Sequence, residues 1–181
     1  AFPAIVSKAI APNGQLQAIH RIYLSGDGKK APVSEPKMCL GSIKGTAIRL
    51  AEPMDELAIT ENLETALAVF QLSKLPTWAA ISAGGLEDLQ VPITVKYVHL
   101  FADLDQNGVG QRAAEKLAAR LLLERKTVFI HLPPLEIPQE SKGVDWLDVL
   151  NRENRTALFQ EVWSKRTPYK SGVSTLFREP R

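Results

Sequence analysis

The sequence is poor in cysteine and histidine: its 181 residues contain one cysteine, Cys39, and three histidines. A single cysteine excludes an internal disulfide and a cysteine-rich zinc site. This cysteine usage fits a reducing compartment, so we expect a cytoplasmic protein. No apolar run approaches the roughly 20 residues that a membrane-spanning helix needs, and we expect no membrane association. The formal net charge of +2 is too small to identify a partner by itself.

The chain contains enough apolar residues for a folded core, since hydrophobic residues make up 45% of it. That share argues against wholesale disorder, and the length suits one α/β domain or a small domain followed by a larger one. The first residues, AFPAIVSKAIA, have neither an initiating methionine nor the charged start of a signal peptide. We therefore expect the sequence to be cut from a longer protein.

The first fifty residues are predicted to be mostly β-strand. Residues 4–24 form two apolar or alternating runs around Pro12-Asn13-Gly14, a strong hairpin signal. Residues 38–41 are expected to form a short buried piece, and residues 46–50 another strand. Basic residues outnumber Asp27 and Glu35 here, and they include His20, Arg21, Lys29, Lys30, Lys37, Lys44 and Arg49. We predict a small basic β-rich lobe over residues 1–53 that contacts a polyanion.

From residue 56 onward the pattern alternates between strand and helix. The predicted strands cover residues 56–60, 77–82, 97–102 and 127–132. The predicted helices cover residues 63–72, 86–90, 111–125, 145–150 and 156–165. Such alternation is typical of a mostly parallel sheet with right-handed crossovers. We therefore predict an α/β domain over residues 54–166, followed by a C-terminal linker or tail over residues 167–181.

The stretch KYVHLFADLDQNGVGQRAAE, residues 96–115, is the centre of this domain. Asp103 and Asp105 follow a buried strand, and alternate side chains of an extended chain point the same way. Glu61 follows the predicted strand over residues 56–60, and Asp145 and Asp148 follow a proline-rich loop. Carboxylates that are held close repel one another unless a cation lies between them. Oxygen ligands without cysteine favour Mg²⁺ or Mn²⁺ over zinc.

Three other interpretations of this stretch compete with a metal site. An EF-hand loop would begin at Asp103, but its twelfth position is Ala114 and a strand precedes it. A dinucleotide fingerprint over Gly108, Gly110 and Ala113 would place two carboxylates against a pyrophosphate. The acids could also be solvated loop residues that form Asx turns. The residues alone leave this last interpretation open.

Four segments together resemble the Toprim domain, in the form found in plasmid- and phage-borne primases and primase-helicases: LAITENLETALAV, ISAGGL, VHLFADLDQNGVGQRAAEKLA and GVDWLDVL. The resemblance covers roughly residues 56–150, and the segments occur in the family's order. The preceding segment, HRIYLSGDGKKAPVSEPKMCLG, is similar to the one before Toprim in the same proteins. The resemblance implies a mostly parallel four-stranded sheet flanked by helices.

The resemblance also implies a set of site residues. Glu61 matches the motif glutamate, Asp103 and Asp105 match the paired aspartates, and Asp145 matches the later acid. Glu61, Asp103 and Asp105 would be catalytic, and all four would bind Mg²⁺ or Mn²⁺. The family usually has glycine where this chain has Asn62, so the backbone there is expected to tolerate a left-handed turn. Two acids, Glu64 and Asp148, are left without an assigned role.

Residues outside the acidic group carry further expectations. The lobe residues expected to contact nucleic acid or nucleotide are His20, Arg21, Lys30 and Lys37, of which Lys37 is similar to a family lysine near the site. Trp78, Trp146 and His99 are expected to lie in the core. His131 ends the strand next to the proposed site, which makes a substrate contact one of its possible roles.

The function implied by the resemblance is that of a DNA primase core: metal-dependent, template-directed synthesis of an RNA primer during DNA replication. The partners would be a single-stranded DNA template and nucleoside triphosphates. A zinc-binding module or a helicase motor would lie elsewhere in the parent protein, because this sequence has no Walker A motif. Two alternatives are a Toprim nuclease or strand-breaking enzyme and a non-catalytic DNA-binding module of a helicase-primase. Rejoining of broken strands would need a tyrosine nucleophile, and no tyrosine lies in a recognisable motif.

Overall fold

The computed structural model describes residues 1–171. The strands are β1 Ala4–Ile10, β2 Leu16–Tyr23, β3 Lys37–Gly41, β4 Ala47–Arg49, β5 Glu56–Thr60, β6 Thr77–Ala79, β7 Tyr97–Phe101, β8 Leu104–Asp105, β9 Thr127–His131 and β10 Gly143–Val144. The helices are α1 Leu63–Ser73, α2 Ala83–Asp88, α3 Val109–Leu123, α4 Trp146–Leu150 and α5 Arg155–Ser164. Residues 172–181 of the predicted tail lie outside the described part. No helix in residues 1–171 is both long and apolar enough to cross a bilayer.

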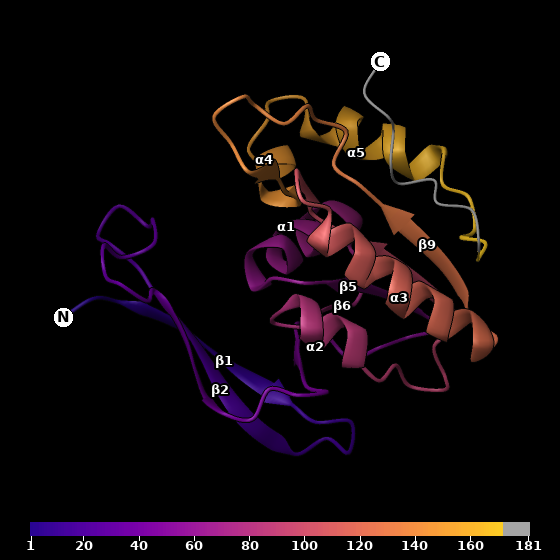
Figure 1. The fold of residues 1–181 in the computed structure, drawn as a ribbon, viewed down its shortest axis with the longest axis horizontal. Coiled ribbons are helices and arrows are strands. Elements are labelled where there is room, and N and C mark those ends of the chain that lie inside the picture. The colour runs from indigo at the N-terminus through magenta and orange to yellow at the C-terminus, as the bar shows by residue number, and fades with distance from the viewer. Residues whose placement is uncertain (172–181) are drawn as a thin grey trace.

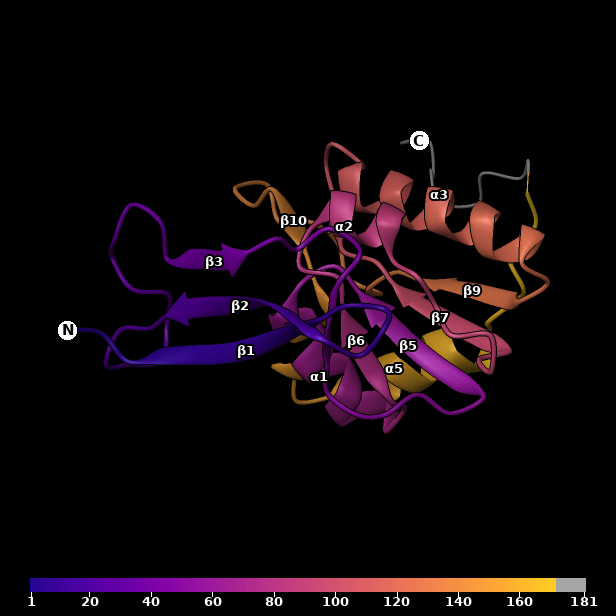
Figure 2. The same ribbon diagram turned by 90° about the horizontal axis from the view of Figure 1, so that it is seen from below.

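Four parallel strands form the centre of the molecule in the order β6-β5-β7-β9. Helices α2 and α3 cover one face of these strands, and α1, α4 and α5 cover the other (Figures 1 and 2). Because both faces are covered, the side chains of β7 from Val98 to Phe101 are all buried. The four-stranded parallel sheet between helices that the resemblance implied is confirmed.

Each face of the sheet has its own apolar cluster. On one side, Leu117 and Leu121 of α3 pack with Leu57 and Leu100 of the sheet. On the other side, Phe101 packs with Trp146 of α4 and Phe159 of α5. Trp78 and Trp146 are almost completely buried, which confirms that both belong to the core.

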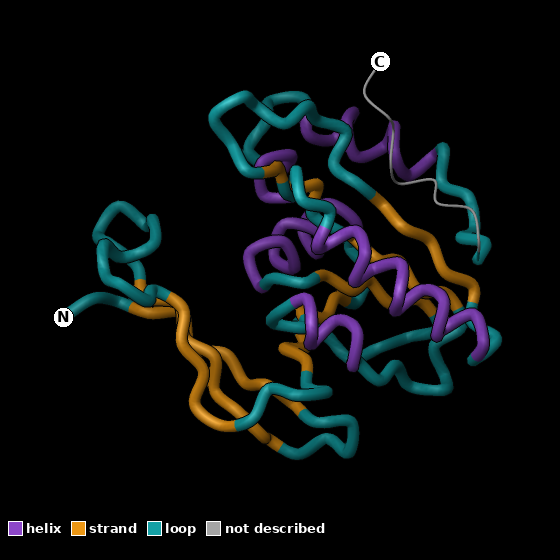
Figure 3. Tube along the Cα trace, in the orientation of Figure 1, coloured by secondary structure: helices purple, strands orange, loops and turns teal. Residues whose placement is uncertain are grey.

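The first three strands form an antiparallel lobe at one end of the molecule (Figure 3). Its hairpin turn contains Gly14 at φ +83°, a left-handed backbone that glycine adopts without strain. The short strand β4 pairs with both β1 and β6, in antiparallel fashion on each side. One eight-stranded sheet, in the order β3-β2-β1-β4-β6-β5-β7-β9, therefore runs continuously across the predicted boundary after residue 53.

The two faces of the lobe have different surroundings. The inner face contains Ile22, which packs with Leu63 and Ala66 of α1. The outer face is open, and Val6 and Leu40 there are 63% and 67% exposed. The prediction that residues 38–41 are buried is wrong, because they belong to the edge strand β3, whose residues from 38 onward are exposed.

Candidate active site

Acidic side chains from three parts of the chain line one cavity of about 270 Å³. Glu61 follows β5, and Asp103 follows β7, its parallel neighbour in the sheet. Asp105 belongs to β8, and Asp145 and Asp148 lie at the start of α4. The cavity thus lies outside the carboxyl ends of parallel strands, where α/β sheets commonly bind ligands.

The short pairing of β8 with β10 brings Asp145 to this cavity. In this antiparallel ladder Gly143 lies opposite Asp105, and Val144 opposite Leu104. Gly143 has no room for a side chain, because a Cβ atom would lie 2.7 Å from the Leu104 carbonyl oxygen. Continuing the ladder by one residue places Asp145 opposite Asp103.

Asp103 is held by two side chains of the α1 region. Asn62 Nδ2 donates to Asp103 Oδ2 at 3.1 Å, and Thr65 Oγ1 donates to Asp103 Oδ1 at 3.1 Å. Burial and then the negative charges of Asp145 and Glu61 raise the pKa of Asp103 to about 7, although these two hydrogen bonds oppose the rise.

Asp105 satisfies the start of helix α3. Its Oδ1 accepts from the Val109 backbone N–H and its Oδ2 from that of Gly110, both at 3.1 Å. The N-cap residue, Gly108, has no side chain to do this, so Asp105 replaces it from the neighbouring strand.

Glu61 does not cap the helix that follows its strand. Burial, followed by the charge of Asp105, raises its pKa, while a hydrogen bond from the Ala83 backbone and the charge of Lys37 oppose the rise. The N-cap of α1 is Asn62, whose side chain makes no capping bond. Asn62 has an extended backbone at φ −104°, so the expected left-handed turn is absent and glycine is not required there.

Asp145 and Asp148 form a capping box on α4. Asp145 Oδ1 accepts from the backbone N–H groups of Leu147 and Asp148, at 2.8 and 3.0 Å. Asp148 Oδ2 accepts in return from the Asp145 N–H at 3.0 Å. Burial is the main reason that the pKa of Asp145 is raised, with a further contribution from the charge of Asp148.

Oxygens of three acidic residues border the space beside Gly110, which has no side chain to fill it. A Cβ atom on this glycine would lie 3.4 Å from Asp105 Oδ2, 3.5 Å from Glu61 Oε2 and 3.5 Å from the Asp103 carbonyl oxygen. Three oxygens therefore border this position, and hard oxygen donors are the kind that Mg²⁺ or Mn²⁺ binds. Within residues 1–171 no three acidic, histidine or cysteine side chains are already gathered at metal-holding distance. The hydrogen bonds that Asp103, Asp105 and Asp145 make would have to rearrange around a cation.

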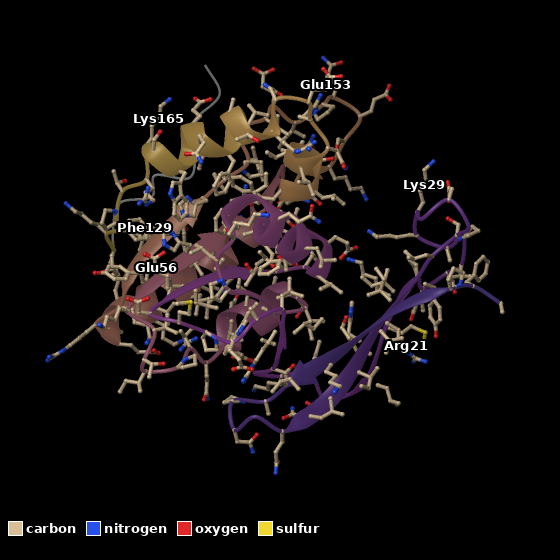
Figure 4. The ribbon with its side chains drawn as sticks, turned by 180° about the vertical axis from the view of Figure 1, so that it is seen from behind. Arg21, Lys29, Glu56, Phe129, Glu153 and Lys165 are labelled. Atoms are coloured by element: carbon tan, nitrogen blue, oxygen red, sulfur yellow. The ribbon has the colours of Figure 1, made fainter. Side chains whose placement is uncertain are left out.

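Three of the four lobe residues expected to bind nucleic acid or nucleotide lie near this site. Lys37 Nζ lies 2.8 Å from Glu64 Oε1, and Lys30 Nζ lies 3.7 Å from the same atom. His20 is buried on the inner face, where Lys37 and Glu64 influence its pKa. Arg21 is on the opposite face, because successive residues of a strand alternate, and it lies near Tyr23 (Figure 4). The structure does not bring Arg21 together with the other three.

The two histidines of the central strands lie in an aromatic cluster on the α5 side. His99 Nδ1 is 3.0 Å from His131 Nε2, and both rings are buried and lie close to the Trp163 ring. The core position expected for His99 is confirmed. His131 does not line the acidic cavity, because its ring turns to the face of the sheet that α5 covers.

Several functional positions escaped the sequence reasoning. Asn62 and Thr65 hold Asp103, and Gly110 and Gly143 allow the close approaches that form the cavity. The departure from the family's glycine at position 62 was a visible signal for the first of these. The spacing of Thr65 from Asn62 on one helical turn is a weaker signal, which many surface helices share.

Comparisons with known proteins agree with this architecture. A family model described as the Toprim domain matches residues 56–155, and one described as a domain of unknown function matches residues 1–50. No curated protein matches significantly.

Solved structures similar to the chain include a DNA primase domain from Pseudomonas aeruginosa, with a TM-score of 0.59 and 15% identity. A DnaG primase catalytic domain bound to single-stranded DNA has a TM-score of 0.61 and 13% identity. Each match covers 91% of this chain and 52% of the solved chain. The Aquifex aeolicus primase with zinc-binding and RNA polymerase domains has a TM-score of 0.61 and 14% identity, covering 92% of this chain and 41% of its own. The chain thus spans about half the length of these structures or less.

Proposed function

The chain belongs to the Toprim domain family, and on this premise we propose that it is the catalytic core of a DNA primase. The proposed reaction joins ribonucleotides on a single-stranded DNA template and depends on a divalent cation. The observation that carries the proposal is that the likeness to primase cores covers 91% of the chain, so it includes the basic lobe as well as the Toprim region. A site with acids on one side and lysines on the other suits a nucleoside triphosphate.

Mg²⁺ or Mn²⁺ would be held by Glu61, Asp103, Asp105 and Asp145, whose side chains line the same cavity. The hydrogen bonds that Asp103, Asp105 and Asp145 make now would have to rearrange around the ion. The chemistry that such an ion supplies is stabilisation of the negative charge on phosphate oxygens.

Glu61 is the residue proposed to move a proton. Glu61 leaves the helix after its strand uncapped, whereas Asp105 and Asp145 each accept two backbone N–H groups at the start of the helix that follows them. Burial raises the pKa of Glu61. A carboxylate with a raised pKa is a better general base for the hydroxyl that attacks the phosphate.

The lobe is proposed to position the substrates. Lys37 and Lys30 extend from the lobe toward Glu64 and would contact the triphosphate. His20 is buried on the same face of the lobe. The template strand would contact the same face electrostatically. A zinc-binding module or a helicase elsewhere in the parent protein would complete the primase.

The proposal is tested by synthesis in the full-length parent protein. Glu61→Gln keeps the shape of the side chain but removes its charge and its proton, so primer synthesis should fall by about a hundredfold or more. Glu56→Gln is the matched control, because Glu56 lies at the other end of the same strand β5 and should be dispensable. Melting temperatures should remain close to that of the parent in both variants.

Synthesis by Glu61→Gln at close to the parental rate would remove Glu61 from the chemistry. Metal-dependent cleavage of DNA by the parent, without incorporation of nucleotides, would favour the nuclease alternative. DNA binding with neither activity would favour the non-catalytic module.

A further inference from the structure

Glu64 lies between the basic lobe and the acidic cavity. It occupies the first turn of α1, and its side chain is 21% exposed. Lys37 Nζ is 2.8 Å from Glu64 Oε1 and 3.0 Å from Oε2, so one ammonium group contacts both oxygens. Lys30 approaches the same carboxylate at 3.7 Å. Burial by itself would raise the pKa of Glu64, but the hydrogen bond and charge of Lys37 outweigh it and keep the pKa below its usual value.

The groups around this carboxylate are those that a phosphate group would use. Lys37 and Lys30 supply two ammonium groups on the inner face of the lobe. His20 lies on the same face and is only 5% exposed, and its Nδ1 has no hydrogen-bond partner among residues 1–171. A buried ring nitrogen without a partner is uncommon and costs free energy, so it is a candidate contact for a ligand.

The acidic residues of the cavity act on Glu64 in the opposite sense from the two lysines, because they repel its carboxylate. The charges of Glu64 and Asp145 lie close enough for Glu64 to contribute to the raised pKa of Asp145. Glu64 is therefore attracted from the lobe and repelled from the cavity, which holds its carboxylate on the lysines.

We propose that Glu64 is an internal competitor for phosphate, which occupies Lys37 and Lys30 until a polyphosphate ligand displaces it. This inference rests on the proposed function, because it takes the two lysines as the phosphate-binding groups. Glu64 lowers the affinity of the site for any polyanion and so sets a threshold for the entry of a triphosphate. The displaced group is a carboxylate of charge −1, whereas an incoming triphosphate carries several negative charges and more acceptor oxygens.

The test measures binding of inorganic triphosphate to the chain by calorimetry, with a chelator present so that no metal contributes. Glu64→Gln retains the size of the side chain and removes the competing charge. It should bind triphosphate about threefold to tenfold more tightly than the parent, since a charge pair that is partly exposed contributes at most about a tenfold effect. Lys37→Ala added to Glu64→Gln should abolish the gain.

Glu161→Gln is the matched control. Glu161 pairs with Lys165 at 3.0 Å on α5, on the opposite side of the molecule from the lobe (Figure 4). Like Glu64→Gln, this substitution removes one negative charge, but triphosphate binding should stay at the parental level. An equal gain in this control would show a general charge effect and overturn the proposal.

Glu64→Asp provides a second measure, because the shorter side chain keeps the charge but withdraws from Lys37. It should bind triphosphate more tightly than the parent but less tightly than Glu64→Gln. Equal or weaker binding by both variants overturns the proposal, as does an absence of triphosphate binding in the parent and in Glu64→Gln alike. These outcomes are distinct from a failure of the proposed function, because triphosphate binding is measured without primer synthesis.

Discussion

At the scale of single residues, Asp103 links the electrostatics of the site to the stability of the fold. Its pKa rises from 3.8 to about 7 on folding, mainly because of burial and the nearby charge of Asp145. The folded state therefore binds a proton more tightly than the unfolded state. Stability from this group is fully present below pH 3.8 and is lost as the pH rises through 7.

Asp103→Asn should remove this loss. The free energy of unfolding of the variant minus that of the parent should be larger at pH 8 than at pH 4, by on the order of 2–4 kcal/mol. Denaturant unfolding with a chelator at both pH values measures the difference. Asp88→Asn on α2 is the control, because Asp88 is half exposed and pairs with Lys44 at 3.9 Å. A pH dependence that Asp103→Asn leaves unchanged would contradict the assignment.

At the scale of elements, the β8–β10 ladder depends on the absence of a side chain at Gly143. Gly143→Ala would place a methyl group 2.7 Å from the Leu104 carbonyl oxygen and 3.0 Å from the Asp105 Cα atom, and both are backbone atoms. The variant should lose about 1–3 kcal/mol of stability, as expected for overpacking. It should also bind Mn²⁺ more weakly in a calorimetric titration, because Asp145 would move away from Asp103.

Gly84 provides a control for Gly143, because its replacement by alanine is expected to leave stability unchanged or raise it. Gly84 lies in helix α2, and within residues 1–171 no neighbouring atom lies within 4 Å of its would-be Cβ position. Gly84→Ala should be neutral or gain up to about 1 kcal/mol through helix propensity. Equal effects of the two substitutions on unfolding would rule out steric crowding at β10 as the cause.

The packing of α5 on the sheet leads to a second prediction, which concerns the stability of the fold in acid. Burial and the charge of Arg166 lower the pKa of His99 to about 4, and burial with His99 and Arg166 lowers the pKa of His131 to about 3. Glu56 on β5 approaches the His99 ring at 3.9 Å but does not reverse the shift. Because the unfolded state protonates first, these groups make stability fall as the pH drops below 6.5 toward 3–4.

A chain with both His99→Phe and His131→Phe keeps the aromatic stacking and removes the two titrating rings. Its free energy of unfolding should fall less than that of the parent between pH 7 and pH 4, by on the order of a few kcal/mol. Circular dichroism during denaturant titration provides the measurement. Parallel curves for the two proteins would show that the histidine pair does not govern stability in acid.

At the scale of the whole molecule, one continuous sheet fixes the lobe relative to the acidic cavity. Its inner face presents Lys30 and Lys37 toward α1, whereas Arg21 lies on the outer face. A nucleic acid that reaches the cavity should therefore contact the two lysines and not Arg21.

Affinity for single-stranded DNA should fall steeply with salt, as measured by fluorescence anisotropy. Lys30→Ala with Lys37→Ala should weaken binding and reduce the slope of log affinity against log salt by about 1.4, or about 0.7 for each phosphate that a lysine no longer neutralises. Arg21→Ala should retain the parental slope. A flatter slope in Arg21→Ala alone would place the DNA on the outer face of the lobe.

Local patterns were enough to predict much of this protein. The apolar runs identify β5, β7 and β9 within a few residues, and the apolar periodicity does the same for α1 and α3. This is possible because the apolar side chains of a segment indicate which of its faces is buried. The placement of Glu61 and Asp103 at the same edge of the sheet also follows from sequence, since parallel strands end at one edge. That β5 and β7 are neighbours is decided by the sheet order.

The tertiary structure decided which surfaces meet. Asp145 reaches the cavity through the pairing of two-residue strands that carry no pattern of their own, and Asn62 acts through its side chain on Asp103 rather than through a turn. Strand alternation separates Arg21 from His20, but the packing of Ile22 on α1 determines which of the two faces the site. Such long-range contacts depend on the fit between segments far apart in the chain, which neither segment specifies by itself.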